Sequence, residues 1–184
     1  MEARYTYADY KGWDLKKGER YELIYGAAYA MAGPSASHQL ILGELFKQIA
    51  IYLTGKPCKV VPAPYDVRLF YAEDESDDTV VQPDISIVCD KKKRGPEGCR
   101  GAPDMVIEVL SPSNSAIEME EKYNLYKDAG VREYWLANPK TKTLKAHFFA
   151  DEVHIRTYAA TDKADVGIFP GFAVDLEPVF AEDI

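Results

Sequence analysis

The sequence lacks the signals that mark a membrane or exported protein. It contains no run of about 18 apolar residues and no cationic segment followed by an apolar one at its start, so neither a membrane span nor a signal peptide is predicted. Internal repeats and low-complexity linkers are also missing. For a chain of 184 residues of this kind we expect one domain over residues 1–184 and a location in the cytoplasm.

Cysteine is scarce, with three residues at Cys58, Cys89 and Cys99. An odd number, at spacings that match no zinc motif, argues against a disulfide framework and against a structural metal. Cys89 falls in an apolar run, and we predict that it is a small residue of the core.

A surplus of positive charge is the third missing feature. The chain has 22 lysines and arginines against 30 acidic residues, which gives a formal net charge of −8. General nucleic-acid binders usually carry a basic footprint, so this balance counts against that class. One basic run, Lys91–Arg94, offers such a patch or is simply a solvated loop. The acidic segment 72–79 repels phosphate, so a nucleic acid has to approach elsewhere.

What the sequence does contain is a pair of acids in apolar surroundings. The segment from Pro103 to Leu110 is apolar at nearly every position, which is typical of a central strand covered on both faces. Glu108 lies inside it, and a carboxylate there has to be paired, bound to a metal ion or kept neutral by a raised pKa. Asp84 opens a second apolar run after a proline, so two strands that each carry an acid are expected side by side.

A helix with a lysine on its buried face follows these strands. Ser115 and Glu118 form the capping-box pattern and a glycine ends the segment, so we predict a helix over 116–129. The spacing of three and four residues places on one buried stripe Met119, Lys122, Leu125, Tyr126 and Ala129. Lys122 then points at the sheet and reaches Glu108, unless its long stem carries the ammonium past its neighbours to solvent.

Two carboxylates and a lysine at one edge of a sheet indicate a magnesium site. Mg²⁺ prefers carboxylate oxygens and retains waters, one of which becomes a nucleophile, while a lysine offsets developing negative charge. We therefore predict that Asp84 and Glu108 bind Mg²⁺, for which Mn²⁺ can substitute, and that Lys122 completes a catalytic site.

Several stretches resemble, in order, the Uma2 family, the domain of unknown function 820, which is a branch of the PD-(D/E)XK nuclease superfamily. They are RYELIYG (20–26), PAPYDVRL (62–69), VVQPDISIVCD (80–90), GAPDMVIEVLSPSNS (101–115), EKYNLYKDAGVREYWLANP (121–139) and FPGFAVDL (169–176). A single motif such as PD is unspecific, but the ordered set runs over nearly the whole chain.

The resemblance implies an α/β fold with a restriction-endonuclease-like core, in which a mixed central sheet is flanked by helices, with added β-hairpins. It implies Mg²⁺-dependent hydrolysis of DNA phosphodiester bonds and matches Asp84 and Glu108 to the metal-binding acids of the superfamily. The lysine that the superfamily carries two residues after the glutamate is replaced here by Leu110. Members that resemble this chain supply the amine from the next helix, where Lys122 stands.

Three further residues have two interpretations each. Glu44, on a helix predicted from His38 to Leu53, is either a further metal ligand, as in relatives within the superfamily, or a surface glutamate. Glu22, on a hairpin predicted over 20–32, forms a structural salt bridge or contributes a ligand. His38 either caps or packs the start of its helix or takes part in catalysis.

The remaining segments complete the predicted scaffold. Val131–Ala137 is expected to form a strand reached by a right-handed parallel crossover, and residues 58–70 an edge strand. Leu144–Phe149 and Val153–Tyr158 are typical of an antiparallel hairpin. The two histidines of that hairpin are either exposed or a metal-binding pair, and they are His147 and His154.

Two alternative functions use the same fold. A catalytically inert relative would serve as a nucleic-acid or protein interaction module, as the lost lysine after Glu108 and the acidic balance suggest. A hydrolase of smaller phosphate esters would keep the acids in an enclosed pocket. For a DNA-cleaving enzyme we expect a homodimer, because cutting both strands needs two active sites.

Overall fold

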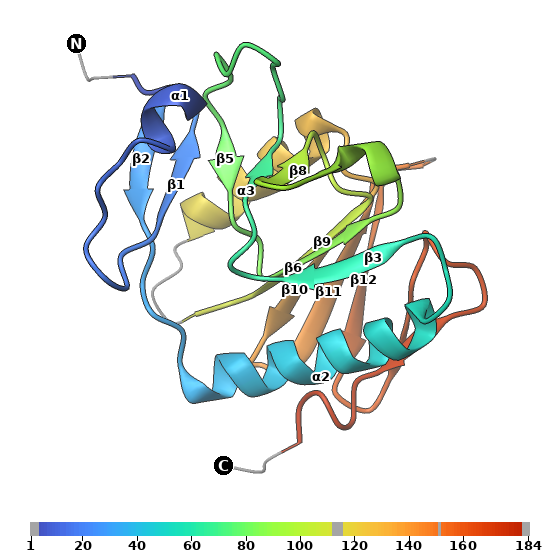
Figure 1. Ribbon diagram of the computed structural model, residues 1–184. Coiled ribbons are helices and arrows are strands. Elements are labelled where there is room, and N and C mark those ends of the chain that lie inside the picture. The colour runs from blue at the N-terminus through green and yellow to red at the C-terminus, as the bar shows by residue number, and fades with distance from the viewer. Residues whose placement is uncertain (1–3, 112–115, 151, 182–184) are drawn as a thin grey trace.

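The protein is built around a mixed β-sheet, seen in a computed structural model that describes residues 4–111, 116–150 and 152–181 (Figure 1). The order of strands in this central sheet is β12-β11-β10-β9-β6-β3. These strands are β3 (Lys59–Pro62), β6 (Ile85–Val88), β9 (Met105–Val109), β10 (Glu133–Asn138), β11 (Thr143–Phe148) and β12 (His154–Ala159).

Strand β9 lies in the interior of this sheet, as its apolar pattern predicts. All five of its residues are buried, and it pairs antiparallel with β6 and parallel with β10. Helix α3 (Ala116–Ala129) makes the connection from β9 to β10 and has the predicted bounds. The predicted N-cap Ser115 lies outside the described residues.

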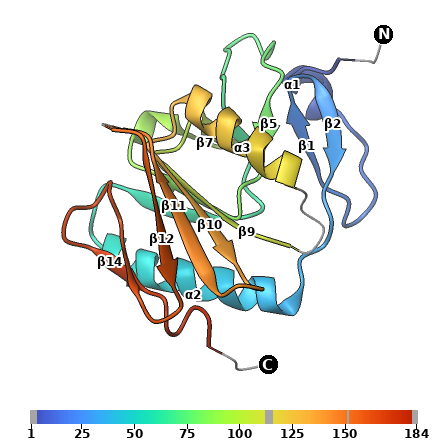
Figure 2. The same ribbon diagram turned by 180° about the vertical axis from the view of Figure 1, so that it is seen from behind.

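Helices α2 and α3 lie on opposite sides of the central sheet (Figure 2). α2 (Ala36–Leu53) begins after Ser35, whose hydroxyl accepts a hydrogen bond from the backbone N–H of His38. It buries Ile41, Leu45, Ile49 and Leu53 in one core cluster with the odd-numbered residues of β9. Because successive side chains of a strand point to opposite faces, Glu108 points to the other face, toward α3.

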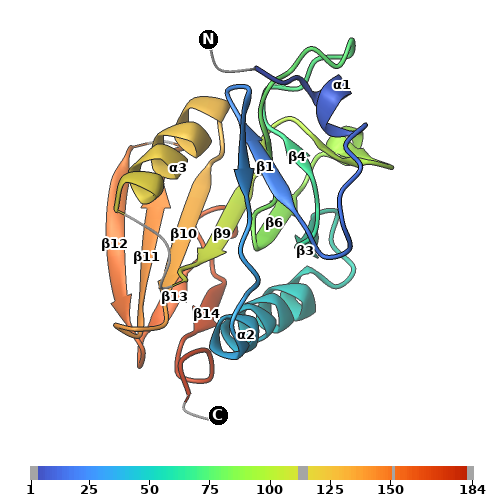
Figure 3. The same ribbon diagram turned by 90° about the vertical axis from the view of Figure 1, so that its left-hand side faces the viewer.

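A second sheet, of order β2-β1-β5-β4-β8-β7, stands beside the first. Its strands are β1 (Tyr21–Ile24), β2 (Ala27–Ala30), β4 (Val67–Arg68), β5 (Val80–Val81), β7 (Arg94–Gly95) and β8 (Gly98–Arg100). β1 and β2 form the predicted hairpin, and the chain passes from β2 directly into α2 (Figure 3). The short helix α1 (Tyr7–Tyr10) packs its aromatic residues on this sheet.

The predicted antiparallel hairpin is confirmed, because β11 and β12 pair antiparallel. The edge strand predicted over 58–70 is confirmed only in its first part: β3 is an edge strand, but the rest of the segment contains β4, an interior strand of the second sheet. The basic run forms a short 3₁₀ helix, η1 (Lys91–Lys93), in the turn between β6 and β7. β13 (Lys163–Asp165) and β14 (Ala173–Asp175) form a small sheet, after which Val179 and Phe180 dock in the core.

The prediction that the chain has no disulfide is wrong. Cys58 and Cys89 are joined by a disulfide bond, while Cys99 is a free, buried thiol. Cys58 precedes β3 and Cys89 follows β6, and these two strands pair antiparallel. The sheet register therefore brings together two cysteines that lie 31 residues apart in the chain.

The histidines of the β11–β12 hairpin do not form a pair. His147 lies opposite Ile155, whereas His154 lies opposite Phe148, so the two rings point to opposite faces of the sheet. His154 is exposed as expected, but His147 is buried among aromatic rings of the α3 side. No helix in the described part of the chain is long and apolar enough to cross a membrane.

Candidate active site

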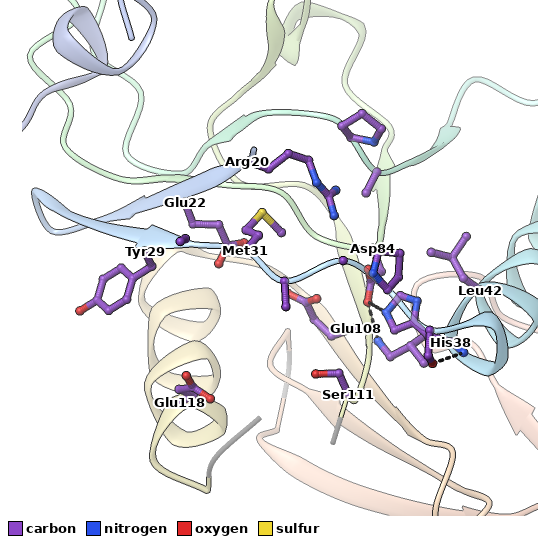
Figure 4. Close-up of a pocket in the computed structure, with 18 of the residues that line it drawn as sticks. Arg20, Glu22, Tyr29, Met31, His38, Leu42, Asp84, Glu108, Ser111 and Glu118 are labelled. Atoms are coloured by element: carbon purple, nitrogen blue, oxygen red, sulfur yellow. Dashed lines mark hydrogen bonds and ion pairs between the residues drawn. The ribbon is translucent and has the colours of Figure 1, made fainter. Parts of the chain in front are cut away.

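All of the predicted site residues except Glu44 meet at a pocket of about 900 Å³ where the two sheets approach each other (Figure 4). One face of the β1–β2 hairpin forms one wall, and the first turn of α2 forms another. The start of α3 closes a third side. Asp84, Glu108 and Lys122 all line this pocket, together with Glu22 and His38.

Asp84 is held by donors from two different elements. The backbone N–H of Val109 donates to its Oδ2 over 2.8 Å, and Nε2 of His38 lies 3.0 Å from the same oxygen. The Val109 contact crosses from β6 to β9, so the sheet pairing itself fixes Asp84 beside Glu108. The hydrogen bond to Asp84 raises the pKa of His38, although burial of the ring acts in the opposite direction.

Glu108 is 9% exposed and lies at the base of the pocket. Its Oε1 accepts hydrogen bonds from Nζ of Lys122 over 2.9 Å and from the hydroxyl of Tyr126 over 2.7 Å. Burial raises the pKa of Glu108 to about 7, with the charges of Asp84 and Glu22 adding to the rise, while Lys122 and Tyr126 oppose it. A carboxyl with such a pKa gains or loses its proton near neutrality.

Lys122 lies between two acids and does not extend to solvent. Besides Glu108, it contacts Oε2 of Glu22 at 3.2 Å, and its side chain is 20% exposed. Burial lowers the pKa of its ammonium, but the charges of Glu108 and Glu22 raise it by more, so the pKa is above its usual range. The lysine is therefore a permanent cation inside the pocket, and its alternative placement in bulk water is wrong.

Glu22 forms the salt bridge that its place on the hairpin suggested. It is 5% exposed, and its Oε1 also accepts the backbone N–H of Gln82 over 3.0 Å. Through these contacts Glu22 ties the second sheet to Lys122 of α3. The role of Glu22 as a metal ligand stays a prediction.

Glu44 is the one predicted ligand that the structure does not bring to this group. It pairs with Lys47 and accepts a hydrogen bond from Nε2 of Gln48 over 3.2 Å. It lines a different pocket, toward the C-terminal segment. Six residues separate it from His38, which turns it about 240° around the helix axis and moves it about 9 Å along it. The expectation of Glu44 as a further metal ligand is therefore not supported.

Asp84 and Glu108 have a chemistry that fits Mg²⁺. Within the described ranges, no group of three or more His, Cys, Asp or Glu side chains is arranged to hold a metal ion. Mg²⁺, however, is usually held by one or two carboxylates, with waters and substrate phosphates as its other ligands. Among the described residues, the donors to Asp84 use Oδ2 and those to Glu108 use Oε1, so Oδ1 and Oε2 accept no hydrogen bond from any of these donors.

Sequence reasoning did not assign a role to Tyr126 beyond packing. Its position four residues after Lys122 on the buried face of α3 brings its hydroxyl to the same oxygen of Glu108. A buried tyrosine hydroxyl usually needs a hydrogen-bond partner, and that requirement was the available signal.

Comparisons with known proteins agree with this fold. The model of a family described as "Uma2: Putative restriction endonuclease" matches residues 7–177. Two proteins of Synechocystis sp. are similar in sequence. "Uncharacterized protein slr1290" is 27% identical over 91% of this chain and 88% of its own length, and "Uncharacterized protein sll1609" is 25% identical over 71% and 73%.

A solved structure has the same architecture. The crystal structure described as "a putative nuclease belonging to DUF820", from Anabaena variabilis, superposes with a TM-score of 0.75. The match covers 96% of this chain and 97% of that one at 18% sequence identity. A likeness at this identity shows a shared fold, and the predicted restriction-endonuclease-like α/β architecture is thereby confirmed.

Proposed function

The chain belongs to the Uma2 family, and from that premise we propose that it is a Mg²⁺-dependent endonuclease that hydrolyses DNA phosphodiester bonds. The observation that carries the proposal is the contact between Lys122 and Glu108 beside Asp84, at the base of a pocket. Two acids that suit a hard cation and one permanent cation are what phosphodiester hydrolysis requires.

In this proposal, Asp84 and Glu108 hold the metal ion, which supplies Lewis acidity toward a phosphate oxygen and a bound water for attack. The Lys122 ammonium orients the attacking water and stabilises the negative charge that grows on the phosphate oxygens. Because Glu108 and Glu22 hold the ammonium from two sides, it stays in place before substrate arrives. Lys122 thus takes the part of the lysine that the superfamily carries two residues after its glutamate.

His38 and Tyr126 position the two metal-binding acids. Each donates to one oxygen of its carboxylate and so turns the other oxygen toward the cation. His38 donates in the tautomer or protonation state that carries hydrogen on Nε2, and the raised pKa of its ring favours that state. Neither residue is required to transfer a proton in this scheme.

A homodimer is the part of the proposal that applies to cleavage of both strands of a duplex. One chain supplies one group of Asp84, Glu108 and Lys122, and breaking both strands needs two such groups, whereas a single strand needs one. Light scattering should then report about twice the 20.6 kDa mass of the chain, and a monomer at every concentration would contradict it.

A cleavage assay tests the proposed activity. Supercoiled, linear duplex and single-stranded DNA are incubated with Mg²⁺ or Mn²⁺ and wild-type protein or Asp84→Ala. We expect wild type to cleave at least one form and Asp84→Ala to cleave none. Asp128→Ala is the control, because Asp128 is exposed on α3, away from the pocket. Cleavage that persists in Asp84→Ala would rule out the site, and inactivity of wild type on every form would favour the inert interaction module.

A further inference from the structure

One face of the β1–β2 hairpin presents several side chains to the pocket that have no part in the proposed hydrolysis. Glu22 and Ile24 of β1 and Arg20, just before that strand, occupy alternate positions, and all three line the pocket. Tyr29 of β2, which lies opposite Glu22 in the strand register, and Met31, just after β2, line it as well, and the backbone N–H of Met31 donates to the carbonyl of Arg20. Alternation places all five side chains on one face. Of these, only Glu22 has a part in the arrangement of Lys122.

Arg20 is a cation without an acidic partner in the described residues. Figure 4 shows its guanidinium directed into the pocket, on the side of Asp84. Three other arginines have an acidic partner, Arg68 with Asp77, Arg132 with Asp104 and Arg156 with Asp165, whereas no described acid pairs with Arg94 or Arg100, neither of which lines the pocket. Although several acids line the same pocket, no ion pair joins any of the described ones to Arg20. Its planar group of N–H donors matches the oxygens of a phosphate.

Tyr29 is an exposed aromatic ring on the same face. It is 48% exposed, and no aromatic contact with another described ring holds it. Tyr25, at the tip of the hairpin, is equally exposed, but its ring stacks on Phe70 and it does not line the pocket. In Figure 4 Tyr29 lies at the end of the labelled group farthest from Asp84, with its ring pointing outward, whereas Arg20 lies on the side of Asp84. The two groups therefore lie on either side of Glu22 along the pocket wall.

We propose that Arg20 and Tyr29 form a subsite that binds one strand of DNA. Arg20 holds a phosphate next to the one that is cleaved, and Tyr29 stacks on an unpaired base. This inference rests on the proposed nuclease function and specifies its substrate as single-stranded DNA or an unpaired end.

The form of the pocket favours a single strand over a duplex. In a duplex the bases are stacked on one another, so no base face is available to an aromatic ring on the protein. A single strand offers such faces, and an aromatic platform beside a cation is the usual way in which proteins bind it. The acids also lie at the base of the pocket, where Glu108 is 9% exposed, and a flexible strand reaches them more easily than a rigid double helix.

Binding can be measured separately from cleavage. The full chain is titrated into a fluorescently labelled single-stranded oligonucleotide of about 12 nucleotides, with Ca²⁺ replacing Mg²⁺ to suppress hydrolysis, and anisotropy is recorded. A hairpin duplex of the same length is the second probe. The variants are Arg20→Met and Tyr29→Leu. Their matched controls are Arg132→Met, at the far end of β10 from the pocket, and Tyr25→Leu, equally exposed outside it.

We expect the wild type to bind the single strand more tightly than the duplex. Arg20→Met and Tyr29→Leu should each weaken single-strand binding by about tenfold, and the two controls should leave it unchanged. Arg20→Met should also reduce the slope of log affinity against log salt by about 0.7, because one phosphate contact is lost. Tyr29→Leu should leave that slope intact, and Tyr29→Phe, which keeps the ring, should bind as wild type does.

The outcomes separate this inference from the proposed function. If wild type cleaves DNA through Asp84 but Arg20→Met and Tyr29→Leu bind and cleave normally, the subsite is wrong and the nuclease remains. The same holds if the duplex is bound more tightly than the single strand. If wild type neither binds nor cleaves any DNA, both proposals fail together. Loss of binding in the two variants with unchanged melting curves supports the subsite.

Discussion

Nζ of Lys122 lies 2.9 Å from Oε1 of Glu108 and on its other side meets Glu22, so two acids from different sheets share one ammonium. Lys122→Met keeps the aliphatic stem and removes the charge. We expect DNA cleavage to fall by about 100-fold or more, because the developing phosphate charge loses its stabilising cation. Binding of Mn²⁺, measured by calorimetry well above neutral pH so that Glu108 is ionised even without the lysine that lowers its pKa, should be retained, since the amine is not a ligand.

Lys127→Met is the control for that substitution. Lys127 is exposed on the same helix and does not line the pocket. The Lys127→Met substitution should leave both DNA cleavage and Mn²⁺ binding unchanged. A Lys122→Met protein with full activity would overturn the assignment of the lysine.

Removal of His38 should affect metal affinity more than the chemical step. His38→Ala leaves Oδ2 of Asp84 with the Val109 backbone N–H as its remaining donor in the described structure. A lost positioning contact of this kind typically weakens metal binding about tenfold or more. We expect the Mn²⁺ concentration at half-maximal cleavage to rise accordingly, with the rate at saturating metal within a few-fold of wild type. A lost rate with unchanged metal affinity would instead show that His38 is catalytic.

Metal binding should depend on pH near neutrality. Burial raises the pKa of Glu108 to about 7, and the carboxyl must lose its proton to bind a cation, so Mn²⁺ affinity should rise with pH until about 7 and then level off. Tyr126 donates to the ionised carboxylate and thereby lowers this pKa. Tyr126→Phe should move the midpoint upward by about one pH unit. Calorimetric titrations at several pH values measure it, and an unmoved midpoint, as expected for Tyr123→Phe, would contradict the role of the hydroxyl.

Acid should destabilise the protein through His147. Burial, with a smaller contribution from the charge of Lys145, lowers the pKa of His147 to about 4, against about 6.5 in the unfolded chain. Between these two values the unfolded state binds more protons than the folded state, so stability falls as pH falls from 6.5 toward 4. From pH 7 to 5 this group alone should cost about 2 kcal/mol of the free energy of unfolding.

Urea unfolding at both pH values isolates this effect. His147→Phe should lose about 2 kcal/mol less than wild type between pH 7 and 5. His154→Phe, at an exposed position of the next strand, should behave as wild type. Equal losses in wild type and His147→Phe would show that the ring is not held neutral.

The disulfide between Cys58 and Cys89 should contribute measurably to stability. It closes a loop of 31 residues, for which the loss of chain entropy in the unfolded state corresponds to about 3 to 4 kcal/mol. Dithiothreitol should lower the urea midpoint of wild type and of Cys99→Ser. The double variant Cys58→Ser/Cys89→Ser should have the lower urea midpoint even without dithiothreitol, and adding the reductant should not change it. A wild-type midpoint that ignores the reductant would exclude the bond in solution.

The sequence predicted the site correctly where a charged residue falls within a regular pattern of apolar residues along the chain. The apolar run around Glu108 predicted a central strand, and the three-and-four spacing of α3 predicted the direction of Lys122, because each depends on neighbours along the chain. The contact of Lys122 with Glu22 spans 100 residues and joins α3 to the second sheet, and no local pattern reports how these two elements dock.

The wrong predictions also concern contacts between residues that lie far apart in the chain. The count of cysteines carries no information on strand register, and the register of β3 and β6 is what joins Cys58 to Cys89. The place of Glu44 on its predicted helix did not tell which part of the fold that residue faces. Alternation along β11 likewise did not tell which of its faces α3 covers, so His147 was expected at the surface.

The placement of the site at the junction of two sheets has a consequence for how such proteins can diversify. Asp84 directly precedes β6 and Glu108 lies in β9, and every residue of these two strands is buried. Substitutions around the two acids therefore endanger the fold. The pocket face of the hairpin is partly open, and changes at Arg20 or Tyr29 leave the packing of the central sheet intact. A lineage can therefore inherit one reaction and acquire new substrates through the hairpin alone.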